Sequence, residues 1–134
     1  MPVPWRRSLR EPHHEQICVV DDDEAVADSL KLLLEGFGYD VHAYNSGADF
    51  LADRCRCTTG CLIIDQHMPG LDGLDVVDHL QKEGTRLPTI LVSGRLDTNT
   101  KKRAASLSVA SVLEKPFAAD HLIGLIRKAI LEGN

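Results

Sequence analysis

The sequence predicts a doubly wound α/β domain built on a parallel sheet. Its 134 residues match one domain of ordinary length. Short apolar runs alternate with amphipathic stretches of about 10 to 15 residues, a pattern typical of βα units around a parallel sheet. Five such units follow one another along the chain. We therefore expect a single α/β domain with a five-stranded parallel sheet and five helices.

The first two units show a helical stripe and a helix cap. A strand over 16–20 precedes a helix over 24–37, because apolar side chains recur there at helical spacing. A second strand over 41–44 follows, and Ser46 is placed to cap a helix that runs to about residue 54. Both units thus have the local signals of a strand followed by a helix.

The third unit begins with a continuous apolar run over 61–64, which is expected of a central strand buried on both faces. In the last unit, the helix has an apolar stripe that would face the sheet. The remaining predicted elements are a helix over 74–83, a strand over 89–92, a helix over 98–107, a strand over 111–113 and a helix over 118–131.

Composition excludes several classes of function. The chain is 43% hydrophobic and 26% charged, and its net charge of −5 disfavours binding to nucleic acid or anionic membranes. No apolar run approaches the roughly 20 residues of a membrane span, and the first residues lack the apolar stretch of a signal peptide. We expect a cytoplasmic protein with a mobile tail over 1–15, rich in Pro and Arg, and a folded domain over 16–134.

The cysteines do not suggest a metal site. Cys18 and Cys61 lie in apolar runs, where a thiol behaves as a small hydrophobic group. Cys55 and Cys57 are too close together for the usual zinc spacing and have no matching second pair. We expect all four to be free thiols.

Polar residues follow four of the five predicted strands. Ligands of open α/β sheets bind beyond the carboxyl ends of the strands, so these residues should converge at one edge. They are Asp21, Asp22 and Asp23 after the first strand, Asp65 after the third, Ser93 after the fourth, and Glu114, Lys115 and Pro116 after the fifth.

These residue types indicate phosphoryl chemistry assisted by a metal. Carboxylates that lie together repel one another unless a cation compensates, and hard oxygen ligands favour Mg²⁺ or Mn²⁺. A lysine ammonium and a serine hydroxyl can donate to phosphoryl oxygens. Asp65 is a suitable nucleophile, because an aspartate needs no deprotonation at neutral pH and phosphoryl transfer depends on positioning and charge neutralisation.

Four segments together resemble the signatures of response-regulator receiver domains of the CheY-like superfamily. They are V-V-D-D-D-E, I-I-D-Q-H-M-P-G-L-D-G, L-V-S-G and L-E-K-P-F, and they occur in the same order as in that family. The resemblance covers about residues 17–131 and is closest to receivers of nitrogen-fixation and nitrate-type regulators. It implies a flavodoxin-like fold with strand order 2-1-3-4-5 and a signalling protein that catalyses only its own phosphorylation and dephosphorylation.

The resemblance also implies roles for individual residues. Asp65 matches the phosphoacceptor, and Asp22 matches a direct metal ligand. Asp21 matches a ligand that reaches the metal through water, and the backbone carbonyl of His67 matches a third metal contact. Asp23 lies outside this set and is expected to cap the following helix.

Further matches concern the phosphoryl group and its effect on the fold. Ser93, with Gly94 beside it, matches the hydroxyl residue that follows the phosphoryl group. Lys115 matches the lysine that pairs with the phosphoryl group. The peptide bond between this lysine and the following proline, here Pro116, is usually cis in the family. Val112 departs from the pattern, because family members usually carry Tyr or Phe there.

The missing aromatic residue changes the expected signal. We expect phosphorylation to be transmitted by the Ser93 loop and the fourth helix. Glycine is common in the family where Ser108 stands, so the turn before the fifth strand is expected to differ in shape. His67 and Arg95 flank the acceptor, where they either limit the approach of hydrolytic water or are ordinary surface residues.

The expected partners are a sensor histidine kinase or a phosphotransfer protein, and an unknown downstream protein. Without an output domain, a stand-alone receiver would signal by docking, by relay or by forming a homodimer through its last α-β-α face. One alternative is a binding module with the same fold that is never phosphorylated. Another is a haloacid-dehalogenase-type phosphatase with Asp21 as nucleophile, which would lack a cap domain and leave Asp65 unexplained.

Overall fold

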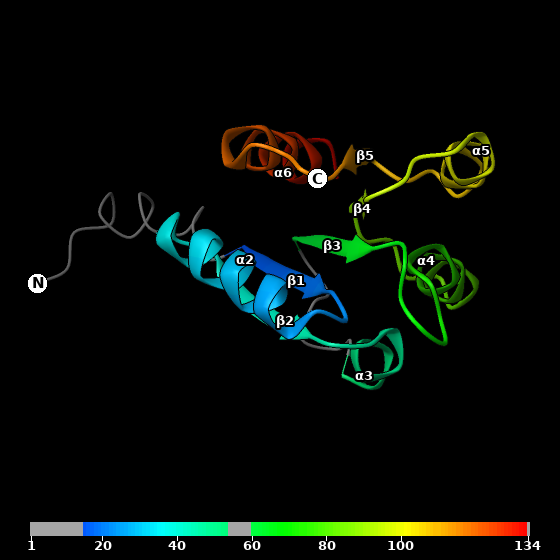
Figure 1. Ribbon diagram of the computed structural model, residues 1–134, viewed down its shortest axis with the longest axis horizontal. Helices are drawn as coiled ribbons and strands as arrows, with labels where there is room; N and C mark the ends of the chain where they lie inside the picture. Colours follow the sequence, from blue (N-terminus) through cyan, green and yellow to red (C-terminus); the bar gives the residue numbers. More distant parts are fainter. Residues whose placement is uncertain (1–14, 54–59, 134) are drawn as a thin grey trace, which may run out of the picture.

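Within residues 15–53 and 60–133, which the computed structural model describes, five parallel strands form one sheet (Figure 1). Their order is β2-β1-β3-β4-β5, which confirms the predicted topology. The predicted tail lies outside the described residues except for Glu15, as do Cys55 and Cys57. The strands are β1 (Gln16–Val20), β2 (Asp40–Tyr44), β3 (Cys61–Asp65), β4 (Thr89–Ser93) and β5 (Ser111–Glu114).

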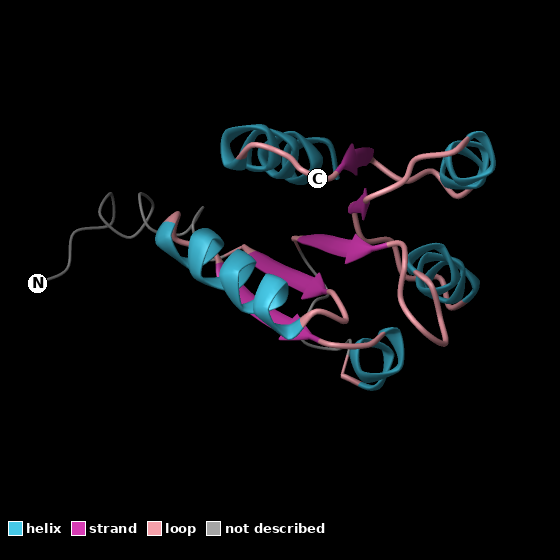
Figure 2. Ribbon diagram, in the orientation of Figure 1, coloured by secondary structure: helices cyan, strands magenta, loops and turns pink. Residues whose placement is uncertain are grey.

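Helices cover both faces of the sheet (Figure 2). In the described part of the chain they are α2 (Glu24–Gly36), α3 (Gly47–Ala52), α4 (Gly73–Lys82), α5 (Thr98–Ser106) and α6 (Ala119–Gly133). One core cluster joins α2 and α6 to the sheet, and a second joins α3, α4 and α5 to the other face. The predicted α/β fold with five helices is therefore confirmed. None of these helices combines the length and apolar character that a bilayer crossing requires.

The three central strands are buried on both faces. Every residue of β3 and β4 is buried, as are the last four of β1. Successive side chains of a strand point to opposite faces, so Val19 packs in the α2 and α6 cluster while Val20 packs in the other. This rigid platform holds the polar residues that follow its strands.

The two cysteines of the central strands differ in state. Cys61 is a free, buried thiol, and burial raises its pKa to about 12. Cys18 is disulfide-bonded, so the prediction of a free thiol is wrong there. An apolar run shows that a cysteine is buried, but it does not show which distant part of the chain lies against it.

Side-chain caps begin the helices beside the sheet edge. The Asp23 carboxylate accepts hydrogen bonds from the backbone N–H groups of Ala25 and Val26, at 3.0 and 3.3 Å, and begins α2. Ser46 Oγ accepts from Asp49 N at 3.0 Å and begins α3. Both caps were predicted and are confirmed. Such caps stabilise a helix by about 1 kcal/mol each.

Arg103 ties α5 to the start of α4. Its guanidinium lies 3.0 Å from Asp72 Oδ2 and 2.6 Å from Asp75 Oδ1. Asp72 and Asp75 form the capping box of α4, so one arginine bridges two carboxylates already held by backbone bonds. The Asp72 backbone N–H and Arg103 lower the pKa of Asp75. Arg103 therefore forms a cross-link between two helices.

The turn before β5 has the shape that glycine favours, although Ser108 occupies it. The backbone N–H of Ser108 donates to Ala105 O and that of Val109 to Ala104 O, which completes a Schellman motif with Ser108 at φ 55°. The expectation of a different turn is therefore wrong, because the two hydrogen bonds hold the left-handed conformation despite the side chain.

This conformation predicts that Ser108→Gly stabilises the protein. A left-handed residue with a side chain costs about 1–2 kcal/mol, of which the greater freedom of unfolded glycine cancels about half. We expect the free energy of unfolding to rise by about 0.5–1 kcal/mol in thermal or urea unfolding. Ala105→Gly, at an exposed position within α5, is the control and should lower it by about 1 kcal/mol. Equal losses of unfolding free energy in both variants would contradict a left-handed conformation at Ser108.

Candidate functional site

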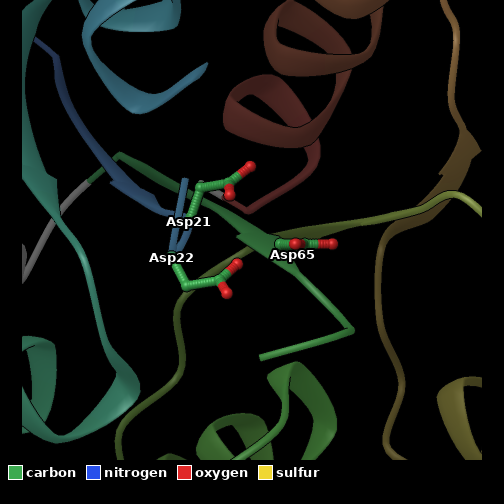
Figure 3. Close-up of side chains that lie close together, drawn as sticks. All are labelled: Asp21, Asp22 and Asp65. Carbon is green, nitrogen blue, oxygen red and sulfur yellow. The ribbon is translucent and has the colours of Figure 1, made fainter. Parts of the chain in front are cut away.

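Three carboxylates gather where β1 and β3 end (Figure 3). Asp21 and Asp22 follow β1, and Asp65 is the last residue of β3. One oxygen from each lies within 4.8 Å of the others. Asp21 and Asp65 are buried while Asp22 is exposed, so the cluster opens to solvent on one side. The predicted convergence of these carboxylates is therefore confirmed.

Lys115 provides the positive charge of the site. Its Nζ lies 3.3 Å from Asp21 Oδ2 and 3.7 Å from Asp65 Oδ2. The bond from Lys115 to Pro116 is cis. One ammonium group neutralises only part of the charge of three carboxylates. The cluster consequently keeps a negative potential toward solvent.

The pKa of Asp65 shows the effect of this crowding. Burial raises it first, the Lys115 ammonium lowers it, and the charges of Asp21 and Asp22 raise it further, with a net upward shift. A divalent cation among the three groups would remove this repulsion. Oxygen donors of this kind suit Mg²⁺ or Mn²⁺, so the cluster could hold such an ion.

The hydrogen bonds of the two aspartates differ. Asp21 Oδ1 accepts from Asp23 N at 2.9 Å, and its Oδ2 accepts from Lys115. Asp65 Oδ1 has only a long contact of 3.4 Å with His67 N, and its Oδ2 lies farther from Lys115 than that of Asp21. Asp65 is therefore held less tightly by its neighbours and keeps more of its lone pairs available.

Ser93 lies at the end of β4, fully buried, beside the loop that follows β3. Its hydroxyl donates to Arg95 O at 2.7 Å and accepts from Arg95 N at 3.1 Å. The His67 ring reaches the same oxygen, with 2.9 Å between Nε2 and Oγ. Gly94 is exposed, and a Cβ added there would meet no atom within 4 Å. Ser93 is thus held by the neighbouring loop rather than by the carboxylates.

Val112 is partly buried and packs in the core cluster beneath α5. A cavity of about 490 Å³ adjoins the carboxylates on the other face of the sheet, between α2 and the segment from Lys115 to Phe117 that precedes α6. Apolar side chains such as Val26 and Phe117 form much of its wall, and Lys115 lies at its polar end. The site therefore joins a charged cluster to an apolar hollow.

Two residues that support the site were not predicted. Gln66 is buried, its Oε1 accepts from Leu74 N at 2.9 Å, and its backbone carbonyl accepts from Gly73 N at 3.2 Å, which anchors α4. Asn45 Nδ2 donates to Asp21 O at 3.2 Å. A polar residue inside a buried segment was a signal for Gln66, whereas nothing in the sequence distinguished Asn45.

Comparison with known proteins gives one consistent result. The family model described as "Response regulator receiver domain" matches residues 17–127. The response regulator protein TodT of Pseudomonas putida is 37% identical over 114 residues, which cover 85% of this chain and 50% of that protein. The transcriptional regulatory protein FixJ of Bradyrhizobium diazoefficiens is 34% identical over 114 residues, which cover 85% and 56%.

Solved structures agree with these matches. Full-length FixJ from B. japonicum superposes with a TM-score of 0.82 at 32% identity, over 90% of this chain and 59% of that one. The chain spans about half the length of the curated relatives it matches. What these relatives share with it is therefore one domain.

Proposed function

The chain belongs to the response regulator receiver domain family, and from this we propose that Asp65 accepts a phosphoryl group in a Mg²⁺-dependent reaction. Membership places the chain in two-component signalling, where receiver domains are phosphorylated on an aspartate. The proposed donor is a phosphohistidine of a sensor kinase or of a phosphotransfer protein, in the cytoplasm. The chain acts as a signalling module and catalyses only its own modification.

The hydrogen bonding of Asp65 carries this proposal. Among the described carboxylates of the cluster, Asp65 combines burial, a raised pKa and weakly engaged oxygens. Both oxygens of Asp21 are engaged, by Asp23 N and by Lys115, which disfavours a phosphatase with Asp21 as nucleophile. An Asp65 oxygen would form the new bond to phosphorus, and the bond from phosphorus to the donor would break, with its electrons leaving on the donor.

Neighbouring residues supply charge and orientation. Asp21, Asp22, Asp65 and the His67 carbonyl would hold the metal, which supplies positive charge to the phosphoryl oxygens when bound. Lys115 would pair with one phosphoryl oxygen, because its ammonium already lies near Asp65 Oδ2. Two-point contact of this kind favours a single phosphoryl orientation.

The phosphoryl group would be sensed through β4 and α5. Ser93 would donate to a phosphoryl oxygen, and the backbone freedom of Gly94 would let the loop follow. Val112 offers no aromatic ring to swing. The moving parts are therefore the Ser93 loop and α5. A downstream protein or a second copy of the chain would bind the α5, β5 and α6 face.

The test is intact-protein mass after incubation with acetyl phosphate and Mg²⁺. We expect one phosphoryl adduct, which should disappear when a chelator removes the metal and return when Mg²⁺ is added in excess. An adduct that forms equally with the chelator would refute the metal site. No adduct, together with no response to beryllofluoride, would instead favour a binding module that works without phosphorylation.

A further inference from the structure

We propose that His67 is a positioning residue that restrains Ser93 in the unphosphorylated protein, and that phosphorylation must break this restraint. The inference rests on the function proposed above. Three groups are involved, the His67 ring, the Ser93 hydroxyl and the Arg95 backbone, and we call their hydrogen bonds the Ser93 network. This network links the loop after β3 to the loop after β4.

The hydrogen-bonding capacity of Ser93 is used up in this network. A serine hydroxyl has one proton to donate and two lone pairs that accept. The proton goes to Arg95 O at 2.7 Å, and one lone pair accepts from Arg95 N at 3.1 Å. His67 Nε2, at 2.9 Å, must then be the donor to the second lone pair. Ser93 has no remaining proton to donate to a phosphoryl oxygen.

The same bonds define what must change on phosphorylation. For Ser93 to donate to a phosphoryl group on Asp65, its proton must leave Arg95 O. The bond from His67 favours the present orientation of the oxygen and therefore opposes this change. His67 also lies 3.5 Å from Arg95 O through Nε2, so its ring contacts both partners of the bond that must break.

The network is connected directly to α5. Only Leu96 separates Arg95 from Asp97, the residue that caps α5 by accepting from Thr100 N at 2.8 Å. A change in the Ser93 to Arg95 turn must therefore be absorbed within two residues of the helix cap. β5 carries Val112 instead of an aromatic residue. The ring that contacts Ser93 is that of His67, in the loop after β3.

The location of His67 makes it suitable for this role. Its side chain is exposed, whereas Ser93 is fully buried. Replacing His67 should not disturb the core, so its effect on Ser93 can be measured separately from folding. Loss of one hydrogen bond that is present only in the unphosphorylated protein should change the apparent affinity for beryllofluoride by about three- to tenfold.

The experiment compares His67→Phe, which keeps a ring but cannot donate, with His67→Gln, whose amide can donate. Apparent affinity for beryllofluoride with Mg²⁺ is measured, together with the amide ¹⁵N shift of Arg95 in the free protein. We expect His67→Phe to bind beryllofluoride about three- to tenfold more tightly and to shift the Arg95 resonance. His67→Gln should restore affinity toward that of the native chain. His79→Phe, an exposed histidine on α4, is the matched control and should change neither quantity.

The outcomes separate the two proposals. If the native chain does not bind beryllofluoride, the proposed function fails and this inference with it. If it binds and His67→Phe has unchanged or weaker affinity, the function stands and the restraint is overturned. Tighter binding in both His67→Phe and His67→Gln would also overturn it, because donation would not matter. A general structural role would weaken binding, which is opposite in sign to our expectation.

Discussion

Asp65→Asn is expected to abolish the phosphoryl adduct completely while raising thermal stability by a few degrees in the absence of metal. Asparagine keeps the shape of the side chain but lacks the anionic oxygen that would attack phosphorus. It also removes a charge that burial and two neighbouring carboxylates disfavour. The same substitution therefore removes the proposed function and relieves the electrostatic repulsion among the carboxylates of the folded protein.

The pH dependence of this stabilisation has a defined sign. Because the pKa of Asp65 is raised in the folded protein, ionisation costs more there than in the unfolded chain. The destabilisation begins as the pH rises above the ordinary aspartate range and is complete above the raised folded value. The melting temperatures of the variant and the native chain should thus converge in acid and diverge toward neutral pH.

Mass spectrometry and thermal unfolding with and without Mg²⁺ measure both effects. Mg²⁺ should stabilise the native chain more than Asp65→Asn, because the variant has lost one ligand. Asp28→Asn, on the exposed side of α2, is the matched control and should keep both the adduct and the melting temperature. An adduct on Asp65→Asn would show that a different residue is the acceptor.

Gly60→Ala is expected to destabilise the fold by about 3 to 5 kcal/mol, the range of the most severe substitutions. Gly60 has φ 104°, and a Cβ there would lie 1.8 Å from the Gln16 carbonyl oxygen. The obstacle is backbone at the start of β1, which is paired with the start of β3, so it cannot move aside without breaking the sheet. Strain at positive φ adds to this overlap.

Urea unfolding monitored by circular dichroism measures the loss. Gly36→Ala is the control, because a Cβ at this last residue of α2 would meet nothing within 4 Å. That substitution should leave stability unchanged or raise it by up to about 1 kcal/mol. If both variants lost the same stability, the overlap with Gln16 would not be the cause.

Periodicity was sufficient to predict the α/β class and the five βα units, whereas the strand order was implied by the family resemblance. A continuous apolar run over 61–64 predicted that β3 is a central strand. Asp65, the polar residue at the end of β3, lies at the edge of the sheet where the carboxylates gather. The gathering of Asp21, Asp22 and Asp65 followed from the rule that parallel strands end together.

What the sequence could not predict depends on contacts between distant loops. The Ser93 network needs the loops after β3 and β4 to approach within hydrogen-bond distance, and the side-chain direction of His67 has no signature in the chain. The disulfide state of Cys18 depends in the same way on tertiary proximity. Ser108 shows the opposite case, in which hydrogen bonds override a residue's own preference.

The link between α5 and α4 has a consequence for the surroundings in which the protein works. Arg103 and its two carboxylate partners are all partly exposed, so dissolved ions screen their attraction. Raising the ionic strength weakens the attachment of α5 to α4 and leaves the buried contacts of the sheet unaffected. We therefore expect the attachment of α5, the helix that we propose to carry the signal, to depend in part on the ionic strength of its surroundings.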